Sequence, residues 1–292
     1  MTRTTSDFAE EGFDHRELAR LVRAKRLERV RRGAYRVPSS SRLTPEQTHR
    51  DLVAATWPLF RQPSVLSHAS AAVLYGLPVS AAQLTRVHVI KPGISSSGMR
   101  KSAHSVVHRI PLADEDIIDF DGYLVTSLRR TVTDLVCALA PADGVAVVDS
   151  ALRLGLDRAE LLAGLGRRPG VRGARRVVRF ADPRAESRGE SVSRWYMAEC
   201  GIPAPELQVP LCGGRYHADF GWRGKRVVGE FDGAVKYDRL LKPGKTAGQA
   251  VMDEKRRDSE IMRDGWWPVH WGWKQLTPLS SFRDFLTHAL SR

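Results

Sequence analysis

One stretch limits the fold of this chain more than any other: Arg215 to Asp232, which reads RYHADFGWRGKRVVGEFD. Two runs within it, Tyr216–Trp222 and Arg226–Asp232, are apolar or alternate in polarity, and each predicts a strand. Between the runs, Gly224 suits the positive φ of a tight hairpin loop. The stretch therefore predicts an antiparallel hairpin that belongs to the core of a sheet.

A two-residue loop at this glycine would fix the hairpin register. Counting outward sets Asp219 opposite Glu230 and His217 opposite Asp232, all on one face, because side chains alternate with a period of two. Opposed carboxylates repel unless a cation lies between them, and Mg²⁺ is commonly held by one or two carboxylates. We therefore predict a Mg²⁺ site whose ligands are Asp219 and Glu230. The alternative is a hairpin with a solvated acidic face.

The sequences ADFGW and VVGEFDG, followed by DEKRRDSEIMRDGWWPVHW, resemble the C-terminal domain of bacterial proteins related to very-short-patch-repair endonucleases. That family belongs to the PD-(D/E)XK nuclease superfamily, so the resemblance implies a mixed sheet flanked by helices, Mg²⁺ and hydrolysis of phosphodiester bonds. It covers Glu186 to Phe285. The residues at the catalytic positions of the family pattern, with two candidates for the catalytic cation last, are Glu190, Asp219, Glu230, Asp232, Lys236 and Lys255.

Two of these residues have other interpretations. Asp232 stands where the superfamily has a lysine, which puts activity in question. Glu190 lies three residues after Ser187, at the start of a predicted helix, so it could simply complete a capping box. A later segment rich in Lys and Gly, residues 233–248, contains Lys236 and is interpreted as a flap that contacts substrate.

The balance of charge points to a polyanionic partner. Forty-six Lys and Arg against 33 Asp and Glu give a net charge of +13, and nucleic acid is the commonest polyanion that such a surface binds. No apolar run approaches the roughly 20 residues of a membrane span, and no signal peptide opens the chain. The three cysteines show no C-x-x-C spacing. We expect a cytoplasmic protein that binds DNA and no membrane.

The N-terminal segment FDHRELARLVRAKRLERVRRGAYRVP begins with a capping box, Asp14 and Glu17, ahead of an amphipathic helix. A basic hairpin follows around Gly33, and the run RRGAYRV resembles the wing of AbiEi-type antitoxins. Residues 1–12 are polar and expected to fray. A winged helix would bind DNA through the basic residues Arg16, Arg20, Arg23, Lys25, Arg29, Arg31 and Arg32. A small packing module with solvated arginines is the alternative.

The middle of the chain alternates predicted helices and strands and resembles the central part of AbiEi-like proteins. Strands are expected at Val87–Ile90 and Val106–Ile110. Three histidines of this region, His88, His104 and His108, share no metal-ligand spacing on one element, so we interpret them as strand or surface residues. His68 is interpreted as a residue of a buried helix.

Together these patterns predict a multidomain α+β protein with a winged-helix-like segment (1–40), an α+β middle domain (41–180) and a C-terminal PD-(D/E)XK-like domain (181–292). The leading hypothesis is a DNA-binding protein with a Mg²⁺-dependent endodeoxyribonuclease domain. The alternative is a non-catalytic AbiEi-type antitoxin or transcriptional regulator, with a cognate toxin protein as its second partner. The four carboxylates favour the first hypothesis, and the displaced lysine favours the second.

Overall fold

The computed structural model describes residues 2–60, 63–92, 98–233 and 247–291. The chain divides into two compact units, each described here by itself. Unit one comprises Met1–Ala138 and Ala159–Gly166, and unit two comprises Leu139–Arg158 and Arg167–Arg292. Helices and three separate sheets make this a multidomain α+β protein, as the sequence predicts. The three-part division at residues 40 and 180 stays a prediction.

Unit one begins with a small sheet and two helices: β1 (Thr2–Thr4), α1 (Thr5–Glu10), α2 (His15–Arg23), β2 (Glu28–Arg31) and β3 (Ala34–Arg36). The predicted capping box of Asp14 and Glu17 starts α2. The expectation that residues 1–12 fray is wrong, because β1 pairs with β3 and Phe8 is buried with its ring edge against Tyr35. Burial of an aromatic ring outweighs the polar character of the rest of the segment.

The larger sheet of unit one has six strands in the order β6-β7-β5-β4-β9-β8. Their bounds are β4 (Val65–Leu66), β5 (Val87–Ile90), β6 (Gly98–Lys101), β7 (Ser105–Arg109), β8 (Ile117–Phe120) and β9 (Tyr123–Thr126). The associated helices are α3 (Pro45–Thr56), α4 (His68–Leu74), α5 (Leu128–Ala138) and α7 (Arg158–Gly164). The core lies between the sheet and the helices α3 and α4, where Leu52, Leu66, Val87 and Val125 are buried together.

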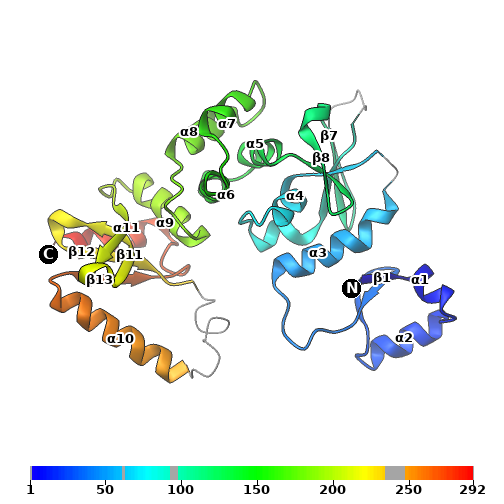
Figure 1. The fold of residues 1–292 in the computed structure, drawn as a ribbon, viewed down its shortest axis with the longest axis horizontal. Coiled ribbons are helices and arrows are strands. Elements are labelled where there is room, and N and C mark those ends of the chain that lie inside the picture. The colour runs from blue at the N-terminus through cyan, green and yellow to red at the C-terminus, as the bar shows by residue number, and fades with distance from the viewer. Residues whose placement is uncertain (1, 61–62, 93–97, 234–246, 292) are drawn as a thin grey trace. The chain divides into compact units, whose positions relative to one another are not determined.

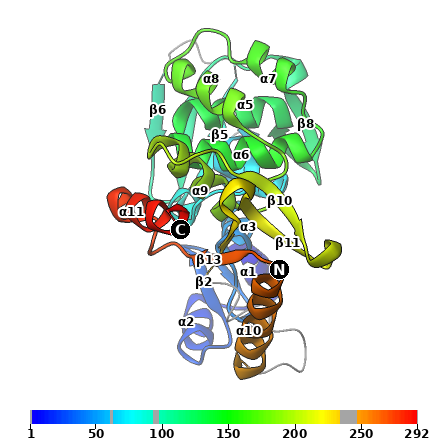
Figure 2. The same ribbon diagram turned by 90° about the vertical axis from the view of Figure 1, so that its left-hand side faces the viewer.

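Unit two opens with packed helices: α6 (Pro141–Arg153), α8 (Val171–Phe180) and α9 (Arg188–Glu199). A buried ion pair joins two of them, with Arg194 Nη2 3.0 Å from Asp149 Oδ2. The sheet that follows has the order β10-β11-β12-β13. Its elements are β10 (Glu206–Leu211), β11 (Tyr216–Trp222), β12 (Val227–Phe231) and β13 (Trp267–Trp271), with α10 (Ala247–Arg263) and α11 (Leu279–Leu290). Figure 1 and Figure 2 both show α10 beside this sheet.

The sheet is mixed, because β10, β11 and β12 are antiparallel neighbours whereas β12 and β13 run parallel. Strand β10 is absent from the sequence prediction, since Pro210 interrupts it. The structure places β10 at the sheet edge, where a proline is tolerated because an edge strand need not donate every backbone N–H.

The predicted hairpin forms with the predicted register. Phe220 pairs with Gly229, and Trp222 pairs with Val227, so one further step sets Asp219 level with Glu230. The loop differs from the prediction: a 3-10 turn at Arg223–Lys225 replaces the two-residue turn, and Arg226, rather than the glycine, takes the positive φ of 54°. The longer loop still leaves the same residues opposite one another on the two strands.

Candidate functional site

The β11–β12 ladder opens at Asp219. The last backbone pair toward this end of the hairpin is Phe220 with Gly229, and the next N–H, that of Phe231, donates to Asp219 Oδ2 at 2.8 Å. A side-chain carboxylate thus takes the acceptor position that a backbone carbonyl would hold in a continued ladder. The predicted pairing of His217 with Asp232 is not among the ladder pairs of the described residues, because the strands part before reaching it.

A guanidinium group lies against the second carboxylate of the predicted pair. Arg257 Nη2, from α10, donates to Glu230 Oε1 and also to the His217 carbonyl oxygen at 3.1 Å. The Glu230 side chain is buried, with 6% of its area exposed. Taking a carboxylate out of water is costly unless a cation and hydrogen bonds compensate for it. Arg257 supplies this compensation, and the sequence analysis did not single it out.

A second cation comes from β13. The parallel register sets His270 beside Glu230. Its Nδ1 lies 3.3 Å from Asp232 Oδ2 and its Nε2 lies 3.2 Å from Asp258 Oδ1. The contact with the Asp232 carboxylate is the main reason why the pKa of His270 rises to about 9, with further contributions from the charges of Asp258, Asp232 and Glu230 that outweigh the effect of burial. His270 is therefore a cation at neutral pH.

The acidic residues at this opening are here called the carboxylate site: Asp219, Glu230, Asp232 and Glu254. Ligand atoms of Asp232, Glu254 and His270 all lie within 4.8 Å of one another. Carboxylate oxygens are the donors that Mg²⁺ prefers, and Asp232 and Glu254 of this group fit that ion, whereas the predicted pair Asp219 and Glu230 is not part of the group. Mg²⁺ takes oxygen ligands, so His270 fits the site as a neighbouring charge rather than as a Mg²⁺ ligand.

Glu190, near the start of α9, is buried and linked to the edge of the same sheet. Its Oε2 accepts from the Glu186 N–H at 2.8 Å and from Gln208 Nε2 of β10 at 3.2 Å. Ser187 Oγ accepts from the Glu190 N–H, as a helix cap does, but Glu190 bonds the backbone one residue before the cap. Burial raises the pKa of the Glu190 carboxyl. The alternative role in a capping box therefore holds only in part.

Of the two lysines predicted as the catalytic cation, the structure describes one. Lys255 is exposed on α10. Lys236 lies outside the described residues, as does most of the predicted flap at 233–248. Within the part of the chain that the structure describes, the cations placed against the carboxylate site are thus Arg257 and His270.

The predicted DNA-binding residues lie on or beside α2 and β2, and all but one of the seven are exposed: Arg16, Arg20, Arg23, Lys25, Arg29 and Arg32. Arg31 is the exception. Its guanidinium is buried and donates to the carbonyl oxygens of Ala55, in α3, and Arg32. The structure therefore corrects the assignment of Arg31, because a side chain that closes the end of a neighbouring helix does not reach phosphate.

Comparison with known proteins adds a family for the N-terminal segment. Residues 4–38 match the model of a family described as "Transcriptional regulator, AbiEi antitoxin". This match confirms the AbiEi resemblance for that segment, while the nuclease resemblance of the C-terminal part stays a prediction. No helix of the described residues is long and apolar enough to cross a membrane.

Two proteins from strains of Mycobacterium tuberculosis, named uncharacterized proteins MT2308 and Rv2248, are each 29% identical to this chain over 209 residues. The aligned region is 65% of this chain and 74% of each relative. A crystal structure of the RV2827C protein from Mycobacterium tuberculosis aligns over 66% of this chain and 75% of its own, with 16% identity and a TM-score of 0.39.

Proposed function

We propose that this chain is a DNA-binding protein whose second unit hydrolyses phosphodiester bonds with Mg²⁺. The observation that carries the proposal is the carboxylate site, where acidic side chains lie at the opening of the β11–β12 ladder and two cationic side chains lie against them. Metal-dependent hydrolysis of a phosphodiester uses a bound ion and positive charge next to the reacting phosphate. The site offers ligands for the first and groups for the second.

The DNA-binding part of the proposal rests on the N-terminal segment, taken as residues 1–40. Its match to a family of transcriptional regulators supports a DNA-binding regulatory role. Six exposed basic side chains on or beside α2 and β2 would contact the phosphate backbone, which dominates affinity for DNA. The excess of 13 positive charges over the whole chain would add attraction at long range.

The residues of unit two would share the catalytic work. Bound Mg²⁺ would polarise the scissile phosphate and lower the pKa of a water. Asp219 and Glu230 would hold the ion, and the Phe231 N–H keeps the Asp219 carboxylate in one orientation. Arg257 would turn from Glu230 to the phosphate when the ion binds. His270, beside the position where the superfamily has lysine, would stabilise negative charge that develops in the transition state.

Two further predicted residues would support this arrangement. Glu190 would orient water at the edge of the site through its link to Gln208. Lys255, exposed on α10, and Lys236 remain candidates for contacts with the DNA backbone.

One observation favours a second candidate function. Arg257 pairs with Glu230, as expected of a carboxylate that serves to stabilise the fold. In that case the chain would be a non-catalytic regulator of the AbiEi type that keeps a nuclease-like domain to bind DNA or a cognate toxin protein. The match of residues 4–38 agrees with either function.

Incubation of supercoiled plasmid with the purified chain separates the two. With Mg²⁺ or Mn²⁺, the wild type should nick or linearise the plasmid, and EDTA or Asp219→Asn should abolish cleavage. Asp284→Asn is the matched control, because Asp284 is exposed on α11, where it pairs with its neighbour Arg283. If none of the proteins cleaves while all still bind DNA in a salt-dependent manner, the regulator is the correct function.

A further inference from the structure

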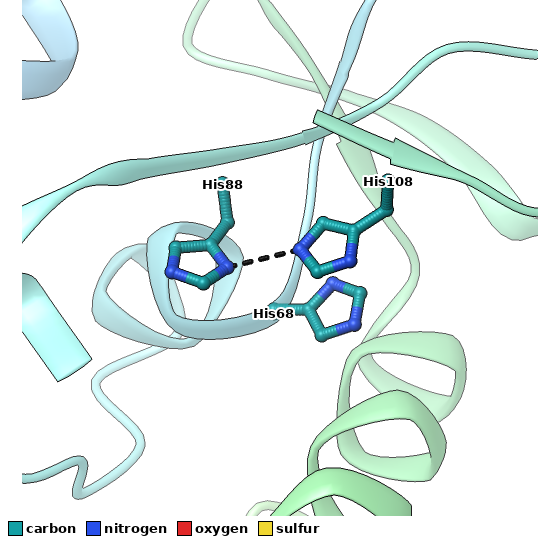
Figure 3. Close-up of side chains that lie close together, drawn as sticks. All are labelled: His68, His88 and His108. Carbon is teal, nitrogen blue, oxygen red and sulfur yellow. Dashed lines mark hydrogen bonds between the residues drawn. The ribbon is translucent and has the colours of Figure 1, made fainter. Parts of the chain in front are cut away.

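Three histidines of unit one converge on one face of the six-stranded sheet, as Figure 3 shows. His88 lies on β5 and His108 on the parallel neighbour β7, where it pairs with Ile90, two residues along from His88. His68 is the first residue of α4, which packs against β5. These residues are here called the histidine trio. Each is 20 positions from the next in the sequence, so the spacing of residues on a single element cannot indicate that they meet. His88 and His108 are strand residues, as the sequence predicts, and the structure adds that their rings meet across neighbouring strands.

The three rings are in direct contact. His88 Nδ1 and His108 Nε2 are 3.0 Å apart and share a hydrogen bond. The ring of His68 stacks on that of His108, with 3.7 Å between the centroids and 9° between the planes. One ring nitrogen from each residue lies within 4.8 Å of the other two. Nitrogens bound to one tetrahedral zinc ion at about 2.1 Å are about 3.4 Å apart, so the His88 and His108 nitrogens, now 3.0 Å apart, would separate by about 0.4 Å to share an ion.

The setting keeps these imidazoles in the form that binds metal. Burial is the main cause that lowers the pKa of His88 to about 3, that of His108 to about 4, and that of His68 well below its ordinary value. A neutral imidazole has one nitrogen lone pair to offer to an ion. Lys101 and Arg130 add positive charge nearby, but Arg130 is paired with Asp116 and Asp134.

The backbone supplies an independent observation. His68 has φ of 49°, in the left-handed region that residues with a Cβ rarely adopt. Strain of this kind persists where the surrounding structure enforces it, and it gathers at functional sites. Here it lies at the residue that brings the third ring to the other two. The hydroxyl of Ser70, one turn into α4, accepts from the His88 N–H at 2.8 Å and holds this turn against β5.

We infer that His68, His88 and His108 form a binding site for a divalent transition metal ion of the zinc class. Imidazole nitrogens suit zinc, cobalt, nickel and copper rather than magnesium, so this site is chemically distinct from the carboxylate site. On binding, the His88 or His108 ring that donates their shared hydrogen bond takes its other tautomer, and the His68 ring leaves the stack. Three protein ligands would leave a fourth position for water or a small ligand, as in catalytic rather than structural zinc sites.

The test uses the full chain, freed of metal with a chelator, in a His270→Asn background that takes the imidazole out of the group formed by Asp232, Glu254 and His270. Binding of Zn²⁺ is measured by calorimetry in the presence of excess Mg²⁺, and Co²⁺ serves as a spectroscopic probe. We expect one Zn²⁺ per chain and a Co²⁺ absorption band of tetrahedral type. His88→Asn and His108→Asn should each lower the affinity at least tenfold, whereas His15→Asn, at an exposed position of α2, should leave it unchanged.

A Co²⁺ spectrum that matches the hydrated ion would overturn the inference, as would equal Zn²⁺ affinities in the trio variants and in His15→Asn. Circular dichroism without metal shows whether each variant folds. If a trio variant does not fold, the melting temperature of the His270→Asn protein decides, because a ligand that binds the native state alone must raise it. No rise with Zn²⁺ would then refute the site.

Discussion

The two units place histidines in opposite electrostatic settings. In unit one, the histidine trio lies among other imidazoles, and burial keeps it neutral. In unit two, His270 is also largely buried, yet its pKa rises to about 9 because carboxylates contact both ring nitrogens. Burial alone therefore does not decide the charge of a histidine; the neighbouring groups do. The same difference separates a site suited to a soft transition metal from a site suited to Mg²⁺ and phosphate.

Buried arginines of the two units also differ in the groups that surround them. Arg31 of unit one donates to backbone carbonyls, whereas Arg257 of unit two donates to a buried carboxylate. A buried charge with a neutral partner and a buried charge with an opposite charge respond differently to substitution. Four changes, in order of decreasing effect, test whether this contrast holds.

The largest effect is expected from Arg257→Met. Removing the guanidinium leaves the buried Glu230 carboxylate without its cation, which should lower the free energy of unfolding by about 3 kcal/mol in EDTA. Mg²⁺ should restore part of this stability, since the ion would take the place of the guanidinium. Urea denaturation measures both quantities.

The matched control is Arg256→Met, because Arg256 is exposed and lies 3.6 Å from Asp253 in a surface pair. Its effect should stay below about 0.5 kcal/mol. Equal losses in the two variants would mean that Glu230 needs no cation. A loss specific to Arg257→Met that Mg²⁺ does not reduce would remove Glu230 from the proposed metal ligands.

Acid should destabilise unit one. Since the pKa of His88 is about 3 in the folded state and near 6.5 when unfolded, the unfolded state binds more protons below pH 6.5. The stability from the neutral trio is complete above pH 6.5 and lost as pH falls toward 4 and 3. Between pH 6.5 and 4.5, His88 alone should cost on the order of 2 to 3 kcal/mol without metal.

Hydrogen exchange of peptides from β5 and β7, read by mass spectrometry, follows this loss. In the His88→Asn variant, the hydrogen exchange of these peptides should depend less on pH. Besides each other, the charged or titratable groups that act on His88 or His108 include His68, His49, Arg86 and Lys101. Protection of β5 that stays constant down to pH 4.5 in the wild type would show that the trio does not control acid stability.

Alkali should act on unit two in the opposite sense. His270 has a raised pKa, so its stabilisation is complete below the unfolded value near 6.5 and is lost as pH rises through about 9. The expected loss of unfolding free energy between pH 6.5 and 9.5 is about 2 kcal/mol, because partial exposure reduces the full linkage value. Tryptophan fluorescence during urea titration reports it, since six of the seven tryptophans lie in unit two. A slope identical in His270→Gln would contradict this assignment.

The smallest effects separate two neighbouring arginines. Arg31→Ala should cost about 1 kcal/mol of stability through the lost hydrogen bonds to Ala55 and leave the salt dependence of DNA binding nearly unchanged. Arg32→Ala should leave stability unchanged and reduce the slope of log affinity against log salt by about one unit. Binding titrations at several NaCl concentrations measure both slopes. Identical slopes for Arg32→Ala and the wild type would exclude Arg32 from phosphate contact.

Local patterns in the sequence account for much of the fold. The hairpin register follows from the alternation of side chains and a short loop. The position of Asp219 opposite Glu230 is therefore predictable, even though the turn type is not. The helix start at Asp14 follows from its capping box in the same way. Such features depend on residues a few positions apart.

The cations of the carboxylate site and the histidine trio depend on longer connections. Arg257 reaches Glu230 only because α10 lies beside the sheet, and His270 reaches Asp232 only because β13 lies parallel to β12. The trio needs β5 and β7 as neighbours with α4 across them. Neither periodicity nor spacing encodes these placements, because they result from tertiary packing of elements with many residues between them. One signal was present: Arg257 lies four residues before the buried Ile261 in α10, on the same helical face.

Gly189 determines how α9 can approach the sheet. A Cβ at this position would lie 2.0 Å from the Phe231 ring, closer than any real contact, so even alanine would push the helix and the strand apart. Phe231 stands between Glu230 and Asp232, and Gly189 directly precedes Glu190. A single missing methyl group thus sets the distance between two acidic segments that the chain supplies some 40 residues apart. Among homologous sequences, this glycine is a stricter criterion for a shared site than the acidic residues alone, because a vacant Cβ position under an aromatic ring does not arise easily by chance.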